Sequence, residues 1–121
     1  MNAALLVQDI FIYPIKSMKG VRLESAKVLE RGFQYDRRWM LVDRAGLFIT
    51  QRTHHQMALI QVELQDNHLL VSSSIKQAIP IQIPLDFKLE SQIEVEVWDD
   101  RMLANLVDPS FDQWFSEVLG I

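Results

Sequence analysis

The chain has 121 residues, of which 49% are hydrophobic and 23% are charged, and its formal net charge is −4. This length and composition are typical of one globular domain, so we expect residues 1–121 to form a single unit. The absence of cysteine excludes disulfides, thiol nucleophiles and cysteine-based zinc or iron–sulfur sites. No apolar run approaches the ~20 residues of a membrane-spanning helix, and the N-terminus lacks a basic region before its apolar stretch. We therefore expect a cytoplasmic protein that does not bind membranes.

Basic residues are concentrated in one part of the chain. Residues 13–52 contain nine Lys or Arg and four Asp or Glu, whereas the remainder contains three basic and twelve acidic residues. If the basic side chains converge in the fold, they can hold a small anion such as a phosphate or a carboxylate. The alternative is that they alternate along the solvent face of strands, since a charge bias is a weak indicator. The negative net charge disfavours nucleic acid as a partner.

Residues 5–52 predict an N-terminal series of strands. Imperfect alternation over residues 5–15, ending near Pro14, predicts the first strand, and residues 21–30 fit a second strand that can accommodate a bulge. Residues 38–43 predict a third strand. The Asp43-Arg44-Ala45-Gly46 sequence predicts a tight turn that leads into residues 47–51 as the hairpin partner.

The second half of the chain predicts more strands and then one helix. A short helical turn is expected at residues 54–58, and further strands are expected at residues 59–65, 68–72, 79–83, 92–98 and 102–106. Pro80 and Pro84 mark the 79–83 segment as an edge strand, and Asp99-Asp100 forms the turn between the last two strands.

The C-terminal segment has helical periodicity. Asp108 is suited to the N-cap and Pro109 to the first turn, and Gly120 follows the last residue of the pattern. The apolar residues that recur at helical spacing are Phe111, Trp114, Phe115, Val118 and Leu119. The fold class is therefore all-β, with about eight or nine short strands forming a small β-barrel or sandwich that one C-terminal helix covers.

Several kinds of site are not supported. His54 and His55 are adjacent, so on extended backbone their side chains point to opposite faces and do not share a metal. Asp99 and Asp100 are better explained as turn formers than as paired catalytic acids. No nucleophile elbow and no glycine-rich phosphate loop occurs in the sequence. We therefore expect no catalytic residue and no metal ligand in this chain.

Two segments remain as candidates for binding. Residues 13–20 place Lys16 and Ser17 at the end of a strand just before a glycine turn, where loops commonly meet ligands. Residues 34–39 contain Asp36 beside Arg37, and an arginine with a fixed partner is a preorganised anion clamp. A surface Lys-Ser turn and a structural Asp–Arg pair explain the same residues equally well.

The order of these motifs resembles the N-terminal β-barrel domain of MOSC proteins, the family of the mitochondrial amidoxime-reducing component and its bacterial relatives. The resemblance extends over nearly the whole chain. It rests on the segments Tyr13–Gly20, Gly32–Asp43, Gly46–Arg52, Met57–Ile60, Val97–Asp100 and Trp114–Gly120.

The resemblance implies a role in binding the molybdenum cofactor, molybdopterin. Lys16 and Ser17 match the family's Tyr-Pro-x-Lys-Ser motif and Arg37 matches its Asp-Arg motif, so these three residues are implied to face the pterin and its phosphate. Arg52 matches a Thr-x-Arg position of lower rank. In the family the barrel precedes a catalytic MOSC domain whose cysteine binds the molybdenum, and a ferredoxin-like domain accompanies some members.

The expected function is therefore that of a cofactor-binding wall. Together with a C-terminal MOSC domain in cis or in trans, the barrel would line the cofactor and substrate cleft. The complete protein would be an oxidoreductase that reduces N-hydroxylated compounds, or a sulfur carrier. By itself this chain is expected to be catalytically silent and to bind no cofactor tightly. The alternative is a stand-alone β-barrel that docks a separate protein partner and uses no cofactor.

Overall fold

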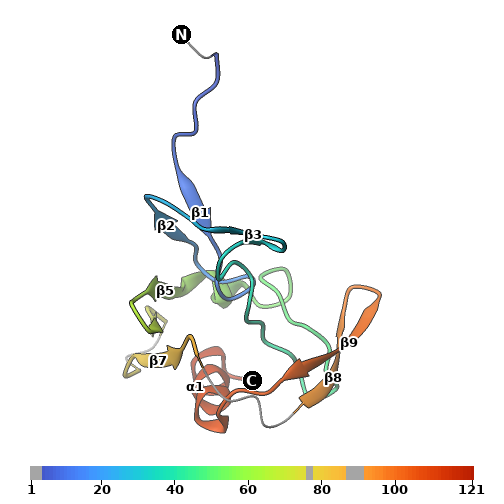
Figure 1. Cartoon of the computed structure of the whole chain (residues 1–121). Helices are drawn as coiled ribbons and strands as arrows, with labels where there is room; N and C mark the ends of the chain where they lie inside the picture. The colour runs from blue at the N-terminus through green and yellow to red at the C-terminus, as the bar shows by residue number, and fades with distance from the viewer. Residues whose placement is uncertain (1–3, 76–77, 87–91) are drawn as a thin grey trace.

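The computed structural model describes residues 4–75, 78–86 and 92–121. These residues form nine short strands, one 3₁₀ turn and one α-helix, an arrangement shown in Figure 1. The elements are β1 (Ile10–Ile12), β2 (Val21–Leu23), β3 (Val28–Leu29), β4 (Gly32–Phe33), η1 (His55–Leu59), β5 (Ile60–Leu64), β6 (His68–Ser73), β7 (Ile81–Pro84), β8 (Gln92–Val97), β9 (Asp100–Asn105) and α1 (Pro109–Leu119). The predicted mostly-β architecture with one C-terminal helix is confirmed.

All of the paired strands are antiparallel neighbours. The largest sheet has the order β5-β6-β7, and β1-β2, β3-β4 and β8-β9 are two-stranded. In the three-stranded sheet Val62 pairs with Val71, and Val71 pairs in turn with Ile81. β7 is an edge strand of this sheet, as Pro80 and Pro84 predict.

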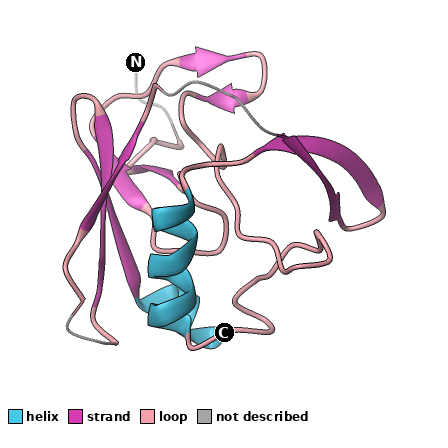
Figure 2. Cartoon of the chain, turned by 90° about the horizontal axis from the view of Figure 1, so that it is seen from below, coloured by secondary structure: helices cyan, strands magenta, loops and turns pink. Residues whose placement is uncertain are grey.

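The core lies between the three-stranded sheet and α1. The helix runs alongside this sheet, whereas the β8-β9 hairpin lies on the other side of the helix (Figure 2). Trp114 and Phe115 pack edge to face, with ring centroids 5.1 Å apart. The indole nitrogen of Trp114 donates a hydrogen bond of 2.8 Å to the carbonyl of Ile79. The helix is therefore fixed to the sheet by apolar packing and by a directional contact.

The helix ends as the sequence predicts. The Asp108 side chain accepts a hydrogen bond of 2.8 Å from the backbone NH of Ser110, and Gly120 closes the helix in the left-handed region with φ 74°. Among the described residues, no helix has the length and apolar character needed to cross a bilayer.

The N-terminal strands are shorter than expected. The predicted strand over residues 5–15 is reduced to β1, and the segment before it extends away from the body (Figure 1). Leu5 and Val7, placed by their alternation on the buried face, are 88% and 84% exposed. The predicted 21–30 strand is divided into β2 and β3, because β2 pairs with β1 and β3 pairs with β4. A strand persists only where a neighbouring strand satisfies its backbone groups.

The predicted strand over residues 38–43 does not form a continuous ladder. The turn after it is present: Asp43 NH and Ile49 NH donate to the carbonyls of Leu47 and Leu41, respectively, and the Asp43 carboxylate accepts from Ala45 NH. Trp39, by contrast, exchanges backbone hydrogen bonds with residues 14 and 16. The segment is thus shared between two different neighbours, which leaves isolated bridges instead of a strand.

Candidate functional site

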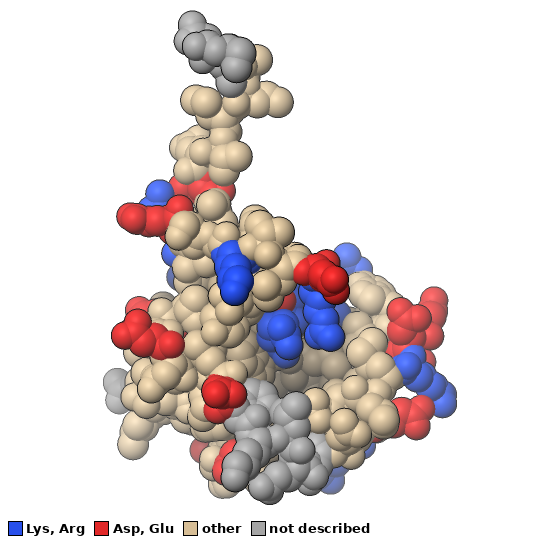
Figure 3. All heavy atoms as spheres, viewed as in Figure 1, with Lys and Arg blue, Asp and Glu red and all other residues tan. Residues whose placement is uncertain are grey.

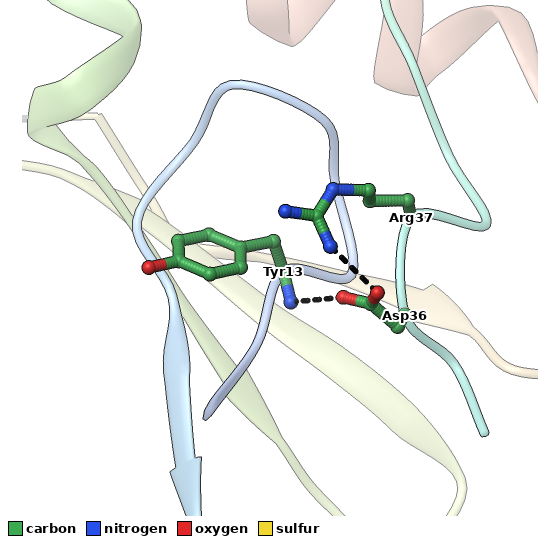
Figure 4. A network of polar contacts seen from close by, with 3 residues as sticks. All are labelled: Tyr13, Asp36 and Arg37. Atoms are coloured by element: carbon green, nitrogen blue, oxygen red, sulfur yellow. Dashed lines mark hydrogen bonds and ion pairs between the residues drawn. The ribbon is translucent and has the colours of Figure 1, made fainter. Parts of the chain in front are cut away.

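Asp36 connects the two candidate segments. One of its carboxylate oxygens accepts a hydrogen bond of 2.7 Å from the backbone NH of Tyr13, and the other accepts one of 2.6 Å from Nη1 of Arg37 (Figure 4). The guanidinium of Arg37 also lies 5.1 Å from the centroid of the Tyr13 ring, and Arg37 NH donates to the Tyr13 carbonyl. The predicted Asp–Arg pair is therefore confirmed, and its carboxylate fixes the direction of the arginine.

Two of the three predicted site residues have left-handed backbone. Ser17 and Arg37 have φ values of 69° and 50°, a conformation that costs a non-glycine residue about 1–2 kcal/mol. Each is held in place by a contact from elsewhere in the chain. The side-chain amide of Gln51 donates 2.7 Å to the carbonyl of Ser17, and Asp36 holds Arg37. Such strain is typical of positions that the surrounding structure overdetermines.

Lys16 lies between two buried anchors of its loop. Ile15 and Met18 on either side are 2% and 1% exposed, respectively, and the Lys16 backbone NH donates 2.9 Å to the Trp39 carbonyl. The ammonium group lies 4.0 Å from the centroid of the Phe48 ring. Partial burial, and secondly the positive charge of Arg37, lower the pKa of the Lys16 ammonium below its ordinary value. The positive charge of Arg37 therefore acts on Lys16.

A cleft of about 1050 Å³ adjoins these residues. Its apolar lining comes largely from the β8-β9 hairpin and α1, including Val95 and Phe115. Its charged lining consists of five basic and four acidic residues, namely Lys16, Arg31, Arg37, Arg38, Arg44, Asp36, Asp43, Asp86 and Asp112. Figure 3 shows basic side chains gathered around the hollow in the centre of this face. A lining that combines cations with apolar side chains fits a ligand that has both an anionic and an apolar or aromatic part.

The predicted site residues do not all reach the cleft. Lys16 and Arg37 line it together, whereas Ser17 is absent from its lining and is half-buried beside it. Arg52 instead lies against Trp98, with its guanidinium carbon 5.7 Å from the ring centroid. Within the described ranges, no three His, Asp or Glu side chains gather at metal-binding spacing.

Three contributors were missed by the sequence reasoning. Phe48 and Trp98 form the aromatic surface under Lys16, and Gln51 holds the Ser17 loop. The sequence predicts Trp98 as the last residue of a strand, directly before the Asp99-Asp100 turn. A large aromatic side chain at the end of a strand was the available signal.

Comparison with models of known protein families identifies the family of this chain. The family model for the MOSC N-terminal beta barrel domain matches residues 4–121. The chain belongs to this family. The predicted resemblance is therefore confirmed over nearly the whole sequence, and the small, mostly-β fold is that of the family's β-barrel domain.

Similar proteins include enzymes named for the molybdenum cofactor. The molybdenum cofactor sulfurase of Bombyx mori is 30% identical over 100% of this chain and 16% of the relative, and that of Oryza sativa subsp. japonica is 28% identical over 94% of this chain and 14% of the relative. Mitochondrial amidoxime reducing component 2 of Rattus norvegicus is 33% identical over 69% of this chain and 26% of the relative. The MOSC N-terminal domain thus spans at most about a quarter of these relatives.

Proposed function

We propose that this MOSC N-terminal domain forms one wall of a molybdenum-cofactor cleft, in which Lys16 and Arg37 bind the anionic group of the cofactor. The observation that carries the proposal is that both cations line the same cleft. Ser17 contributes a hydroxyl at the edge of the same loop. The names of the similar sulfurases supply the identity of the cofactor.

The donor set fits the phosphate and pterin part of such a cofactor. A guanidinium offers several NH donors, of which Asp36 occupies Nη1, and an ammonium adds a point charge beside it. The chain has no cysteine, so a thiolate ligand for molybdenum would come from another polypeptide segment. We propose that a MOSC domain, in cis or in trans, supplies this ligand and closes the cleft. The apolar lining residues of the cleft would offer contact area for that domain.

The chemistry of the complete protein is a further part of the proposal. The similar proteins are named as cofactor sulfurases and as an amidoxime reducing component, which favours sulfur carriage or the reduction of N-hydroxylated compounds. A reductase would need an electron donor, such as a ferredoxin-like domain. The residues of this chain would bind and orient, and the bond-breaking step would take place outside it.

Titration with pyrophosphate tests the anion site in this chain without its cofactor or a further domain. We expect pyrophosphate, followed by ³¹P NMR, to bind the unaltered chain and to bind Arg37→Ala and Lys16→Ala at least about tenfold more weakly, a change typical of losing a charge-assisted contact. Arg22→Ala is the matched control, because Arg22 pairs with Asp9 on the surface and lies outside the cleft lining.

Two results would count against the proposal. One is an equal loss of affinity in Arg22→Ala, which would show that only net charge matters. The other is unchanged affinity per folded molecule in Arg37→Ala, with the loss confined to stability. In that case the contacts of Arg37 with Asp36 and Tyr13 would be its whole role.

A further inference from the structure

A second cluster lies beside the cleft and joins aromatic rings to cations. The rings of Phe48 and Trp98 have centroids 5.2 Å apart and are tilted by 56°. The Lys16 ammonium lies 4.0 Å from the Phe48 centroid and 5.6 Å from that of Trp98. The Arg52 guanidinium lies 5.7 Å from the Trp98 centroid. Of these four residues, Lys16 also lines the cleft, whereas the other three do not.

The cluster is accessible and its cations are not neutralised within the described ranges. Trp98 is 61% exposed, and Arg52 is exposed as well. The ion pairs found in these ranges involve Arg22, Arg37 and Arg101, and none involves Lys16 or Arg52. A large aromatic face left open to water, with two cations held against it, is an unusual surface feature in a chain whose net charge is negative.

The backbone holds this cluster in position. Phe48 NH donates 3.1 Å to the carbonyl of Glu96, and Glu96 NH donates 2.8 Å to the carbonyl of Gly46. These bonds join the β8-β9 hairpin to the segment that carries Phe48. Trp98 follows β8 directly and has φ 56°, an uncommon conformation for a bulky residue. The Phe48 and Trp98 rings therefore lie together because backbone hydrogen bonds join the segment after the Asp43–Gly46 turn to the β8-β9 hairpin.

We propose that Trp98, Phe48, Lys16 and Arg52 form a binding subsite for a small planar aromatic anion. The ligand's ring stacks on the exposed indole, which is the best of the side chains for this contact, and its carboxylate or other acidic group pairs with Lys16 or Arg52. Both cations lie 5.6–5.7 Å from the Trp98 centroid, so the subsite fits one or two fused rings bearing one acidic group. It shares Lys16 with the anion contact proposed for Lys16 and Arg37, whereas Trp98, Phe48 and Arg52 lie outside the cleft lining.

Three small probes separate stacking from charge. 2-Naphthoate is planar and anionic, decahydronaphthalene-2-carboxylate keeps the charge and the size without the aromatic plane, and 2-naphthylmethanol keeps the plane without the charge. We expect 2-naphthoate to bind the full chain at least about tenfold more tightly than either comparator, as measured by ¹H–¹⁵N chemical-shift titration, because each comparator loses one of the two contacts.

Variants locate the site. Trp98→Gly removes the ring and suits the left-handed backbone at this position, and it is expected to weaken 2-naphthoate binding about tenfold or more. Arg52→Gln removes one cation and is expected to weaken it about threefold. The controls are Phe33→Leu, which removes another exposed ring in β4, and Arg101→Gln, which removes a cation from the same β8-β9 hairpin.

Certain outcomes would overturn the proposal. They are equal binding of 2-naphthoate and its saturated analogue, unchanged binding in Trp98→Gly with the amide spectrum of the hairpin preserved, or an equal loss in the control variants. Two variants at residues that only one of the proposals uses distinguish their failures. Arg37→Ala should reduce pyrophosphate affinity and leave 2-naphthoate affinity unchanged, whereas Trp98→Gly should reduce 2-naphthoate affinity more than pyrophosphate affinity.

Discussion

A β-carbon at Gly46 would lie 2.5 Å from the carbonyl oxygen of Glu94. The turn after Asp43 therefore packs closely against strand β8. Glu96 NH donates to the Gly46 carbonyl and Phe48 NH donates to the Glu96 carbonyl, and these hydrogen bonds hold the two segments together. Gly46 also has φ 84°. The position therefore demands glycine twice, once for its backbone conformation and once for its lack of a side chain.

Gly46→Ala should therefore strongly destabilise the fold. The added methyl group meets backbone rather than a movable side chain, so we expect a loss of about 1–3 kcal/mol beyond the conformational penalty. Gly32→Ala is the control, since Gly32 has φ 116° and nothing lies within 4 Å of its added β-carbon. Urea unfolding of both variants measures the difference. Equal losses would show that the close approach to Glu94 is absent in solution.

Substitution of Asp36 should lower the stability of the fold and remove the contact that orients the Arg37 guanidinium. Asp36→Ala leaves the Tyr13 NH and the Arg37 guanidinium without the acceptors that they have now, and we expect a loss of about 1–3 kcal/mol in unfolding free energy. Asp36→Asn keeps a neutral acceptor for Tyr13 and should lose less. The prediction fails if both variants unfold at the urea concentration of the unaltered chain.

The indole of Trp114 should contribute through its polar end as well as its ring. Trp114→Phe keeps an aromatic ring against Phe115 but removes the donor to the Ile79 carbonyl. We expect a loss of about 1–3 kcal/mol, because a carbonyl in a partly buried setting is left unsatisfied. Phe115→Ala should lose about 3–5 kcal/mol, since it leaves a cavity in the core. Thermal unfolding by circular dichroism ranks the two variants, and the reverse order would contradict the packing described here.

Lys16 should make stability rise with pH in the alkaline range. Partial burial and Arg37 lower the pKa of its ammonium in the folded state, so the folded chain releases this proton before the unfolded chain does. Between the lowered pKa and the ordinary lysine value of about 10.4, the unfolded state binds more protons, and the contribution of Lys16 to stability increases with pH.

Comparison with Lys16→Met isolates this effect from other alkaline titrations. In urea unfolding between neutral pH and about pH 10, the unfolding free energy of the unaltered chain should increase relative to that of the variant as the pH rises. A difference between the two chains that stays constant with pH would contradict the lowered pKa.

Local patterns were sufficient for part of the fold. The period-2 alternation of residues 92–97 places Val95 inward with 2% exposure, and the helical spacing of Trp114 and Val118 places both in the core. The Asp108 cap is likewise encoded within three residues. In each case the determining interactions lie within a few residues along the chain, so periodicity and turn chemistry predict the element correctly.

The same patterns failed where strand pairing decides the outcome. Leu5 and Val7 alternate as a strand does, yet both are exposed, because none of the described strands pairs with their segment. Trp39 alternates within a predicted strand, yet its hydrogen bonds go to residues 14 and 16. Alternation specifies which face a side chain prefers, but not which segment lies beside it.

The sequence by itself determined the family, the mostly-β architecture and the identity of Lys16, Ser17 and Arg37 as candidates, because these depend on residue types in a fixed order. Only the tertiary structure decided that Lys16 and Arg37 line the same cleft, that Ser17 lies outside its lining, and that Phe48 and Trp98 lie under Lys16. The physical reason is distance along the chain: contacts between residues separated by tens of positions, such as Lys16 and Trp98, arise only when the hairpins pack together.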